Sequence, residues 1–220
     1  PGLNTDHLWF NLNETAANGK AVVSPIKRAW FHDLRFRHAV SLAIDRRTLA
    51  SITLQGLATP LAGFISPGNR AWVLQLPAID YDLEKARTLL REAGFVEQGV
   101  PEQPELRDAN GNRVEVTLIV PSESQARVQM ATVIQEDLAR LGIKMQVVPL
   151  EFGEFQRRTM QTYEYDVALL GASVSDPDPS SYANFLRSSS PPHQWHPKQP
   201  QPVLIPYSLW NAEELFVDQP

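Results

Sequence analysis

The sequence predicts an α/β fold in which helices flank an open, mostly parallel β-sheet. Three apolar segments, at residues 114–120, 143–149 and 165–172, have the length and composition of strands. Helical patterns at 122–141 and 152–163 separate them, and the joints are short. A strand, a helix and a second strand joined in this way form a βαβ unit with parallel strands. The series therefore predicts an open sheet with helices on both faces.

Composition and charge restrict the class of protein. The chain has 220 residues, of which 43% are hydrophobic and 20% charged, as in soluble globular proteins. The net charge of −5 argues against a nucleic-acid surface, which needs a basic face. Cysteine is absent, which excludes disulfides, thiolate metal sites and cysteine nucleophiles. No apolar run is long enough to span a membrane, and no signal peptide is recognisable; because the first residue is Pro1, we expect an excised piece of a longer chain.

The N-terminal region predicts one strand and one helix. Residues 5–13 alternate in polarity as a strand does. Residues 33–47 carry apolar side chains at helical spacing, which predicts an amphipathic helix packed on the sheet. Asp33 is suited to cap its first turn, and Arg46 and Arg47 are expected later on the same helix.

The middle of the chain predicts a second helix between two irregular segments. Glycine and proline are frequent over residues 55–73, which is typical of a functional or mobile connection. A helix over residues 81–95 begins at the cap Asp82 and ends at Gly94. Residues 99–113 are rich in turn formers, which favours a hairpin before the next strand.

The C-terminal half adds a helix start, a helix stop and two loops. Ser122 with Gln125 three residues later is a capping-box pattern, and Gly142 stops the helix. Loops are expected over residues 173–182 and 186–202, and a further strand over residues 204–209.

Two motifs carry a resemblance to a known family. The first combines Asp-x-Arg-x-Arg-x-Ala from residue 33 with Ala-Ile-Asp-Arg from residue 43, and the second is Tyr81-Asp82 followed by Ala-x-x-Leu-Leu-x-x-Ala-Gly from residue 86. Together they resemble the signatures of the peptide/nickel-type (family 5) extracellular solute-binding proteins of ABC transporters. The resemblance extends from Leu8 to Val217. It implies a periplasmic-binding-protein-like (type II) lobe, in which both signature helices are scaffold.

The resemblance also predicts the domain organisation. Residues 1–220 are expected to be a single fragment that corresponds to the second lobe of a two-lobe protein. The family normally has a helix before the last strand, whereas here Pro202 is followed directly by Val203. We therefore expect a missing segment between residues 202 and 203.

The loop after the third strand is the leading candidate for ligand contact, because open α/β sheets bind ligands beyond the carboxyl ends of their strands. It begins at Ser173, and prolines stiffen the backbone beside Asp176 and Asp178. These carboxylates could receive an ammonium group or could form a rigid turn. Peptide binders of the family carry an aspartate that holds the ligand amine at the position of Ser175, so the motif here is displaced or lost, and Asp176 could substitute for it.

Two aromatic residues complete the predicted ligand-binding set. Phe152 follows the second strand, where the family often has an aromatic residue that lines the pocket, although packing against Phe155 is an alternative. Trp195 lies between His193 and His196 in a loop that could cover a ligand or lie on the surface. No third strong ligand lies near these histidines, so we expect no metal site. The arginines 157 and 158 could pair with a ligand carboxylate or form a solvated face.

The predicted function is the solute-binding component of an ABC importer. Such a protein captures a small solute, here expected to be a peptide, in an interlobe cleft and delivers it to a membrane permease. The predicted partners are this ligand, the permease and the N-terminal lobe of the same chain, on the periplasmic or extracellular face of the cytoplasmic membrane, without cofactor or nucleic acid. The alternatives are a ligand-sensing domain of a regulator and a hydrolase that uses Asp176 and Asp178. No Gly-x-Ser-x-Gly elbow or phosphate-binding glycine loop supports an enzyme.

Overall fold

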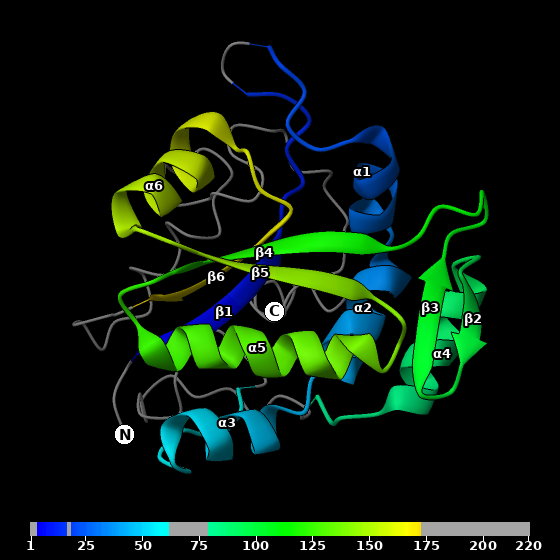
Figure 1. The fold of residues 1–220 in the computed structure, drawn as a ribbon, viewed down its shortest axis with the longest axis horizontal. Helices are drawn as coiled ribbons and strands as arrows, with labels where there is room; N and C mark the ends of the chain where they lie inside the picture. The colour runs from blue at the N-terminus through cyan, green and yellow to red at the C-terminus, as the bar shows by residue number, and fades with distance from the viewer. Residues whose placement is uncertain (1–3, 17–18, 62–78, 173–220) are drawn as a thin grey trace, which may run out of the picture.

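A four-stranded sheet organises the fold that the computed structural model describes for residues 4–16, 19–61 and 79–172 (Figure 1). Its strands are β1 (Thr5–Phe10), β4 (Glu115–Pro121), β5 (Lys144–Leu150) and β6 (Val167–Ala172), in the spatial order β1-β6-β4-β5. β4 pairs in parallel with β5 and with β6, whereas β1 runs antiparallel to β6. The predicted α/β fold with a mostly parallel sheet is confirmed, and its antiparallel member is β1, the first strand in the order of the described sheet.

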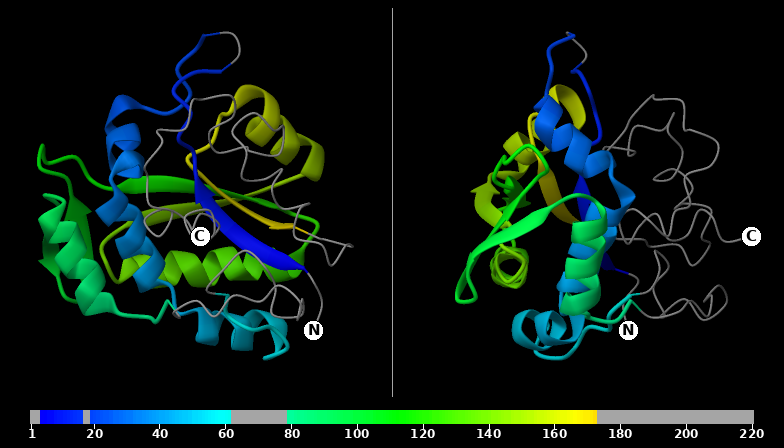
Figure 2. Two further views of the ribbon diagram at one scale, coloured as in Figure 1. Left: turned by 180° about the vertical axis from the view of Figure 1, so that it is seen from behind. Right: turned by 90° about the vertical axis from the view of Figure 1, so that its right-hand side faces the viewer.

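Helices lie on both sides of this sheet. α5 (Gln125–Ala139) connects β4 to β5 and lies in front of them in Figure 1. α1 (Pro25–His32) and α2 (Leu34–Ala43) lie on the opposite side, as the view from behind in Figure 2 shows. α3 (Arg46–Leu54) packs against α5, and α4 (Leu83–Glu92) packs against α2.

Two smaller units complete the described structure. β2 (Val96–Val100) and β3 (Gln103–Arg107) form an antiparallel hairpin, which begins before the turn-rich segment from which the sequence predicted it. α6 (Phe152–Arg157) follows β5 and continues into a π-helical turn, η1 (Arg158–Thr162). No helix among the described residues combines the length and the hydropathy that a membrane crossing requires.

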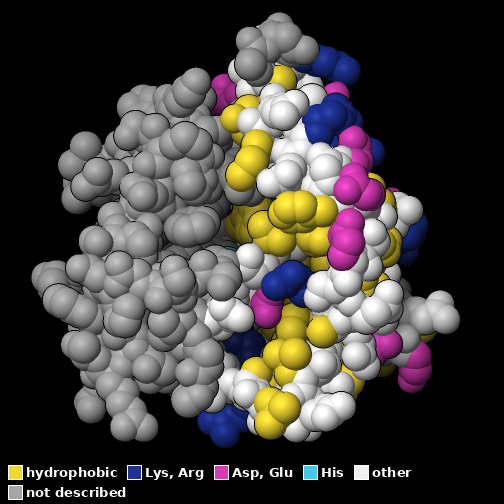
Figure 3. All heavy atoms as spheres, turned by 90° about the vertical axis from the view of Figure 1, so that its left-hand side faces the viewer, with side chains coloured by type: hydrophobic (Ala, Val, Ile, Leu, Met, Phe, Trp, Pro, Cys, Tyr) yellow, Lys and Arg dark blue, Asp and Glu magenta, His cyan; other side chains and the backbone are white. Residues whose placement is uncertain are grey.

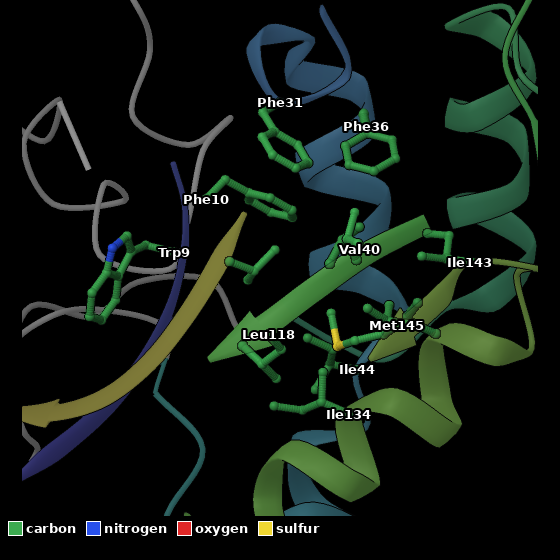
Figure 4. Close-up of a cluster of buried hydrophobic side chains, with 14 of the residues drawn as sticks. Trp9, Phe10, Phe31, Phe36, Val40, Ile44, Leu118, Ile134, Ile143 and Met145 are labelled. Carbon is green, nitrogen blue, oxygen red and sulfur yellow. The ribbon is translucent and has the colours of Figure 1, made fainter. Parts of the chain in front are cut away.

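The hydrophobic core lies between α2, α5 and the sheet (Figure 4). Phe36 of α2 is 1% exposed, and its ring centroid lies 5.9 Å from that of Phe10 and 5.3 Å from that of Phe95. Leu118, which lies on β4, and Ile134, which lies on α5, are both buried in this core. The helical spacing that the sequence showed in residues 33–47 thus predicts the face of α2 that packs on the core.

The helix predicted over residues 33–47 is in fact two helices, so the prediction that its two arginines share one helix with Asp33 is wrong. The backbone amide of Asp45 donates to the Asp137 carboxylate of α5 (3.0 Å), and the Asp45 side chain accepts from the first amides of α3. Arg46 Nη1 donates to the Ser41 carbonyl (2.7 Å) at the end of α2. The hydrogen bond to Asp137, which lies 92 residues later in the sequence, therefore fixes the backbone just after α2. Asp45 then caps α3, the helix that carries Arg46 and Arg47.

Two other helix starts differ from the prediction. The capping box at Ser122 and Gln125 is wrong, because Ser124 caps α5 and accepts from the amide of Arg127. The sequence also did not predict α1, whose cap is Ser24 and whose first residue is Pro25. Proline suits that position because its missing N–H would have no helical acceptor there.

A partly buried carboxylate joins three elements at the start of β6. Asp166 precedes β6, and its Oδ2 atom accepts from the backbone amide of Thr117 in β4 (2.9 Å) and from Nζ of Lys27 in α1 (2.6 Å). β6 first pairs with β4 at Val167 opposite Leu118, so the Thr117 amide lies just outside this ladder. The Asp166 side chain therefore takes the place of a strand carbonyl.

The outer edge of β5 carries features that hinder further strand pairing. β5 is the last strand in the order of the described sheet and pairs only with β4 within the described residues. Pro149 has no amide hydrogen, so it cannot donate to an added strand. Gln135 Nε2 of α5 donates to the Met145 carbonyl (2.6 Å), which occupies an acceptor that an added strand would need.

Candidate functional site

The carboxyl ends of the three parallel strands form one rim of the molecule, at the left of Figure 1. β4 ends at Pro121, β5 at Leu150 and β6 at Ala172, and antiparallel β1 begins at the same rim because Thr5 pairs with Ala172. Figure 3 shows this side, where hydrophobic side chains lie next to side chains of both charges. Parallel α/β sheets bind ligands at such a rim.

An ion pair crosses the rim from α5 to β1. Arg127 Nε donates to Asp6 Oδ1 (2.7 Å), and both side chains are about one third exposed. The pair lies over Gly171 of β6, where an added Cβ atom would be 2.2 Å from Arg127 Nη2 and 2.6 Å from Asp6 Oδ1. Arg127 keeps this position because residue 171 has no side chain.

The guanidinium of Arg127 retains donors at the rim. Its hydrogen bond to Asp6 uses Nε, and within the described residues neither Nη1 nor Nη2 donates to an acceptor. Burial lowers the pKa of the neighbouring His7 to about 4. The negative charge of Asp6 raises this pKa in part, and the positive charge of Arg127 lowers it further. His7 is therefore neutral at pH 7, and Arg127 is the cation of this group.

Phe152 lies at the same rim, directly after β5. Its backbone amide donates to Glu123 Oε1 (2.8 Å) from the loop after β4, and its side chain is 42% exposed. The ring stacks on fully buried Phe155, with centroids 6.5 Å apart and planes 7° from parallel. One face thus packs on the core as one interpretation predicted, while the side chain remains accessible as the ligand-contact interpretation requires.

Arg157 and Arg158 are both paired within α6 and η1. Arg157 Nε donates to Glu154 Oε2 at a distance of 2.7 Å, and Arg158 Nε donates to Glu154 Oε1 at the same distance. Arg157 Nη2 also lies 4.0 Å from Glu164 Oε2. The hydrogen bonds from Arg157 and then Arg158 lower the pKa of Glu154 to about 2. The arrangement favours the interpretation of these arginines as a solvated charged face.

The other predicted site residues lie outside the described residues. They are Ser173, Ser175, Asp176, Asp178 and Trp195, together with the two histidines beside Trp195. The expected strand over 204–209 and the expected gap after residue 202 also lie outside them. In the described part of the chain, no three His, Asp or Glu side chains are grouped as metal ligands.

Sequence reasoning missed the group formed by Asp6, Arg127 and Gly171. Each residue is unremarkable in its own segment, and 121 residues separate Asp6 from Arg127. The predicted order of parallel strands indicated that the loop after β4 and the end of β6 share a rim. It did not indicate that β1 starts there, because antiparallel pairing of an edge strand has no local pattern.

Comparisons with known proteins agree with this architecture. The family model described as "Bacterial extracellular solute-binding proteins, family 5 Middle" matches residues 1–194. The chain is 28% identical over 151 residues to the "Probable ABC transporter-binding protein" of Deinococcus radiodurans, covering 68% of this chain and 24% of that protein. It is 27% identical over 197 residues to the "Probable ABC transporter periplasmic-binding protein SapA" of Escherichia coli, covering 88% of this chain and 30% of SapA.

Solved structures show the same fold. The oligopeptide-binding protein AppA from Bacillus subtilis, in complex with a nonapeptide, matches with a TM-score of 0.64 and 24% identity, over 81% of this chain and 33% of AppA. The periplasmic binding protein DppA from Helicobacter pylori, in complex with the peptide STSA, matches with a TM-score of 0.65 and 22% identity, over 87% of this chain and 32% of DppA. The chain thus spans about a quarter to a third of the length of these relatives.

Proposed function

Because the chain belongs to the bacterial extracellular solute-binding proteins of family 5, we propose that it forms one wall of the ligand cleft in the solute-binding component of an ABC importer. The ligand of this proposal is a peptide, the second wall is an N-terminal lobe of the same chain, and a membrane permease receives the ligand. The site of action is the periplasmic or extracellular face of the cytoplasmic membrane. The family and the structural neighbours are binding proteins, and we infer that this chain likewise binds without catalysis.

The observation that carries the proposal is the rim where three parallel strands end. It offers an arginine whose Nη donors are unused within residues 4–16, 19–61 and 79–172, an accessible aromatic ring, and the end of β6, after which the sequence continues with Ser173. A guanidinium binds a carboxylate through two parallel hydrogen bonds, and the ring of Phe152 offers apolar contact. Within the proposal, Arg127 receives a ligand carboxylate, and the predicted contacts Ser173, Ser175, Asp176, Asp178 and Trp195 lie on the loops that follow.

The test starts from the full-length protein, purified without refolding and analysed by native mass spectrometry. The proposal expects a peptide to remain bound and to be recovered intact. Recovery of cleaved peptide after prolonged incubation would support a hydrolase instead, and recovery of no peptide together with no binding to a mixture of di- to pentapeptides would contradict peptide binding.

Replacing Arg127 with glutamine is expected to weaken peptide binding by about tenfold or more, because a charge-assisted hydrogen bond contributes roughly 1.5–3 kcal/mol. Isothermal titration with the recovered peptide measures the loss. The same peptide with an amidated C-terminus is expected to bind Arg127→Gln and the parent protein equally. The matched control Arg157→Gln, whose arginine is paired with Glu154, is expected to leave affinity unchanged. An equal loss in both variants would contradict the assignment of Arg127.

Replacing Gly171 with alanine is expected to reduce peptide affinity in the same direction as Arg127→Gln. The new Cβ atom would lie 2.2 Å from Arg127 Nη2, so the guanidinium must move. The side-chain ends that it meets are flexible, so we expect the free energy of unfolding to fall by less than about 1 kcal/mol. Titration calorimetry and urea denaturation measure the two effects. If the alanine variant bound the peptide as tightly as the parent, the position of Arg127 over residue 171 would have no part in binding.

A further inference from the structure

A surface pocket of about 420 Å³ lies on α1, at the end of the molecule opposite the rim (Figure 1). One wall is the outer face of α1, and the other consists of the segment after α4 and the turn after β3. Its main lining residues are Ile26, Ala29, Trp30, Phe95 and Asp108. The volume is sufficient for a small ligand. None of these residues belongs to the proposed cleft.

The pocket contains a fixed carboxylate without a positive partner. Asp108 Oδ2 accepts from Trp30 Nε1 (3.0 Å), and Oδ1 accepts from the backbone amides of Asn110 (2.9 Å) and Asn112 (2.8 Å). The Asn112 side chain donates to both oxygens. Burial opposes the charge, but these hydrogen bonds outweigh it and lower the pKa of Asp108. Within the described residues, all of its donors are neutral and no ion pair includes it.

The second carboxylate of the pocket is neutralised. Asp33 accepts from Arg35 through both oxygens, at 2.6 Å from Nη2 and 3.1 Å from Nε. The net charge contributed by the two lining aspartates and Arg35 is therefore the single negative charge of Asp108. An ionised group that lacks an opposite charge favours a cationic ligand over an anionic one.

The remaining surface of the pocket is apolar. Ile26 is 44% exposed and Ala29 is also exposed, on the same face of α1. Trp30 and Phe95 lie beneath them, each 5% exposed, with ring centroids 6.4 Å apart and planes at 63°. The buried rings fix the shape of the pocket, and the exposed aliphatic side chains can cover a short hydrocarbon chain.

We propose that this pocket is a binding site for a small alkylammonium ion. The ammonium group lies beside the Asp108 carboxylate and is held by its negative charge, and the alkyl chain packs on Ile26 and Ala29. The site is separate from the peptide cleft and does not depend on the proposed function. Both the charge and the alkyl chain contribute, because an accessible ion pair alone contributes only ~0.2–1 kcal/mol.

The indole N–H of Trp30 provides a direct reporter, because it donates to the carboxylate that receives the ligand. The experiment titrates the full-length protein with n-butylammonium chloride and follows the tryptophan indole resonances by NMR. Loss of one resonance in Trp30→Phe assigns the reporter. We expect n-butylammonium to shift it with a saturable curve, whereas n-butanol, which lacks the charge, shifts it up to about fivefold less at equal, subsaturating concentration.

Two variants and a matched control test the site. Asp108→Asn retains an oxygen for the backbone amides but removes the charge, and we expect a loss of affinity of up to about fivefold. Ala29→Lys places a cation in the pocket from the exposed face of α1 and is expected to abolish the shift without altering the Asp108 turn. Ala139→Lys makes the same change at an exposed position of α5 outside the pocket and is expected to bind as the parent does.

Three results would overturn the proposal. These are an indole resonance that does not respond to n-butylammonium, an equal response to n-butanol, and an equal loss of binding in Ala29→Lys and Ala139→Lys. Since none of these measurements uses a peptide, failure here leaves the proposed peptide cleft unaffected, and failure of peptide binding leaves this site unaffected.

Discussion

Replacing Gly142 with alanine is expected to lower the free energy of unfolding by about 3 kcal/mol or more. Gly142 follows α5 with a φ of +76°, a conformation that costs an L-residue roughly 1–2 kcal/mol. An added Cβ atom would also lie 2.5 Å from the Leu106 amide nitrogen and 2.7 Å from the Glu105 carbonyl carbon. These are backbone atoms of β3, so the strand must shift, which adds about 1–3 kcal/mol. Urea denaturation measures the loss.

Gly94 is the matched control because it also follows a helix and has a φ of +87°. The nearest atom to its added Cβ is the Ala109 Cβ at 3.8 Å, an ordinary contact. Gly94→Ala therefore carries only the conformational cost of about 1–2 kcal/mol. Equal losses in the two variants would show that the close approach of β3 to Gly142 has no energetic consequence.

Replacing Asp166 with alanine is expected to cost about 3 kcal/mol. The change leaves the partly buried Thr117 amide without its acceptor and Lys27 without its anion. An unsatisfied buried donor costs roughly 1–3 kcal/mol, and the lost charge-assisted bond adds to that. The Asp166 side chain is only 13% exposed, so water replaces the carboxylate poorly. Chemical denaturation at neutral pH gives the difference.

Two companion variants separate the contributions. Asp166→Asn can still present an oxygen to the Thr117 amide and is expected to lose about 1 kcal/mol, the order of one hydrogen bond. Lys27→Met removes the cation but retains the bond between Asp166 and Thr117. If Lys27→Met were as destabilising as Asp166→Ala, the bond to Thr117 would contribute nothing, contrary to the role inferred for Asp166.

Local patterns were sufficient to predict most of the fold. β6 has no polar side chain, and β4 and β5 combine buried apolar residues with polar ones such as Thr117 and Gln146, as strands do. Gly94 and Gly142 mark helix ends where the structure has positive φ. The break between α2 and α3 was not predictable, because it depends on the hydrogen bond that the Asp45 amide donates to Asp137 of α5, 92 residues later in the sequence.

The candidate site was predictable only in its location. The parallel order of the strands indicated the rim, and the position after β5 indicated Phe152, which the structure places there with an exposed side chain. The pair of Asp6 and Arg127 depends on which residue of β6 lies between them, and the register that places Gly171 there arises from tertiary pairing. The loop residues from 173 onward remain predictions.

The outer edge of β5 has a consequence for self-association. A bare edge strand is a template on which another copy of a protein can extend the sheet, and such extension leads to amorphous or fibrillar deposits. Pro149 removes one donor from this template and Gln135 occupies one of its acceptors, the Met145 carbonyl. Since the two obstacles lie near opposite ends of a seven-residue strand, an incoming chain finds little uninterrupted length to pair with. We therefore expect this edge of the described sheet to resist extension by another copy, which favours colloidal stability.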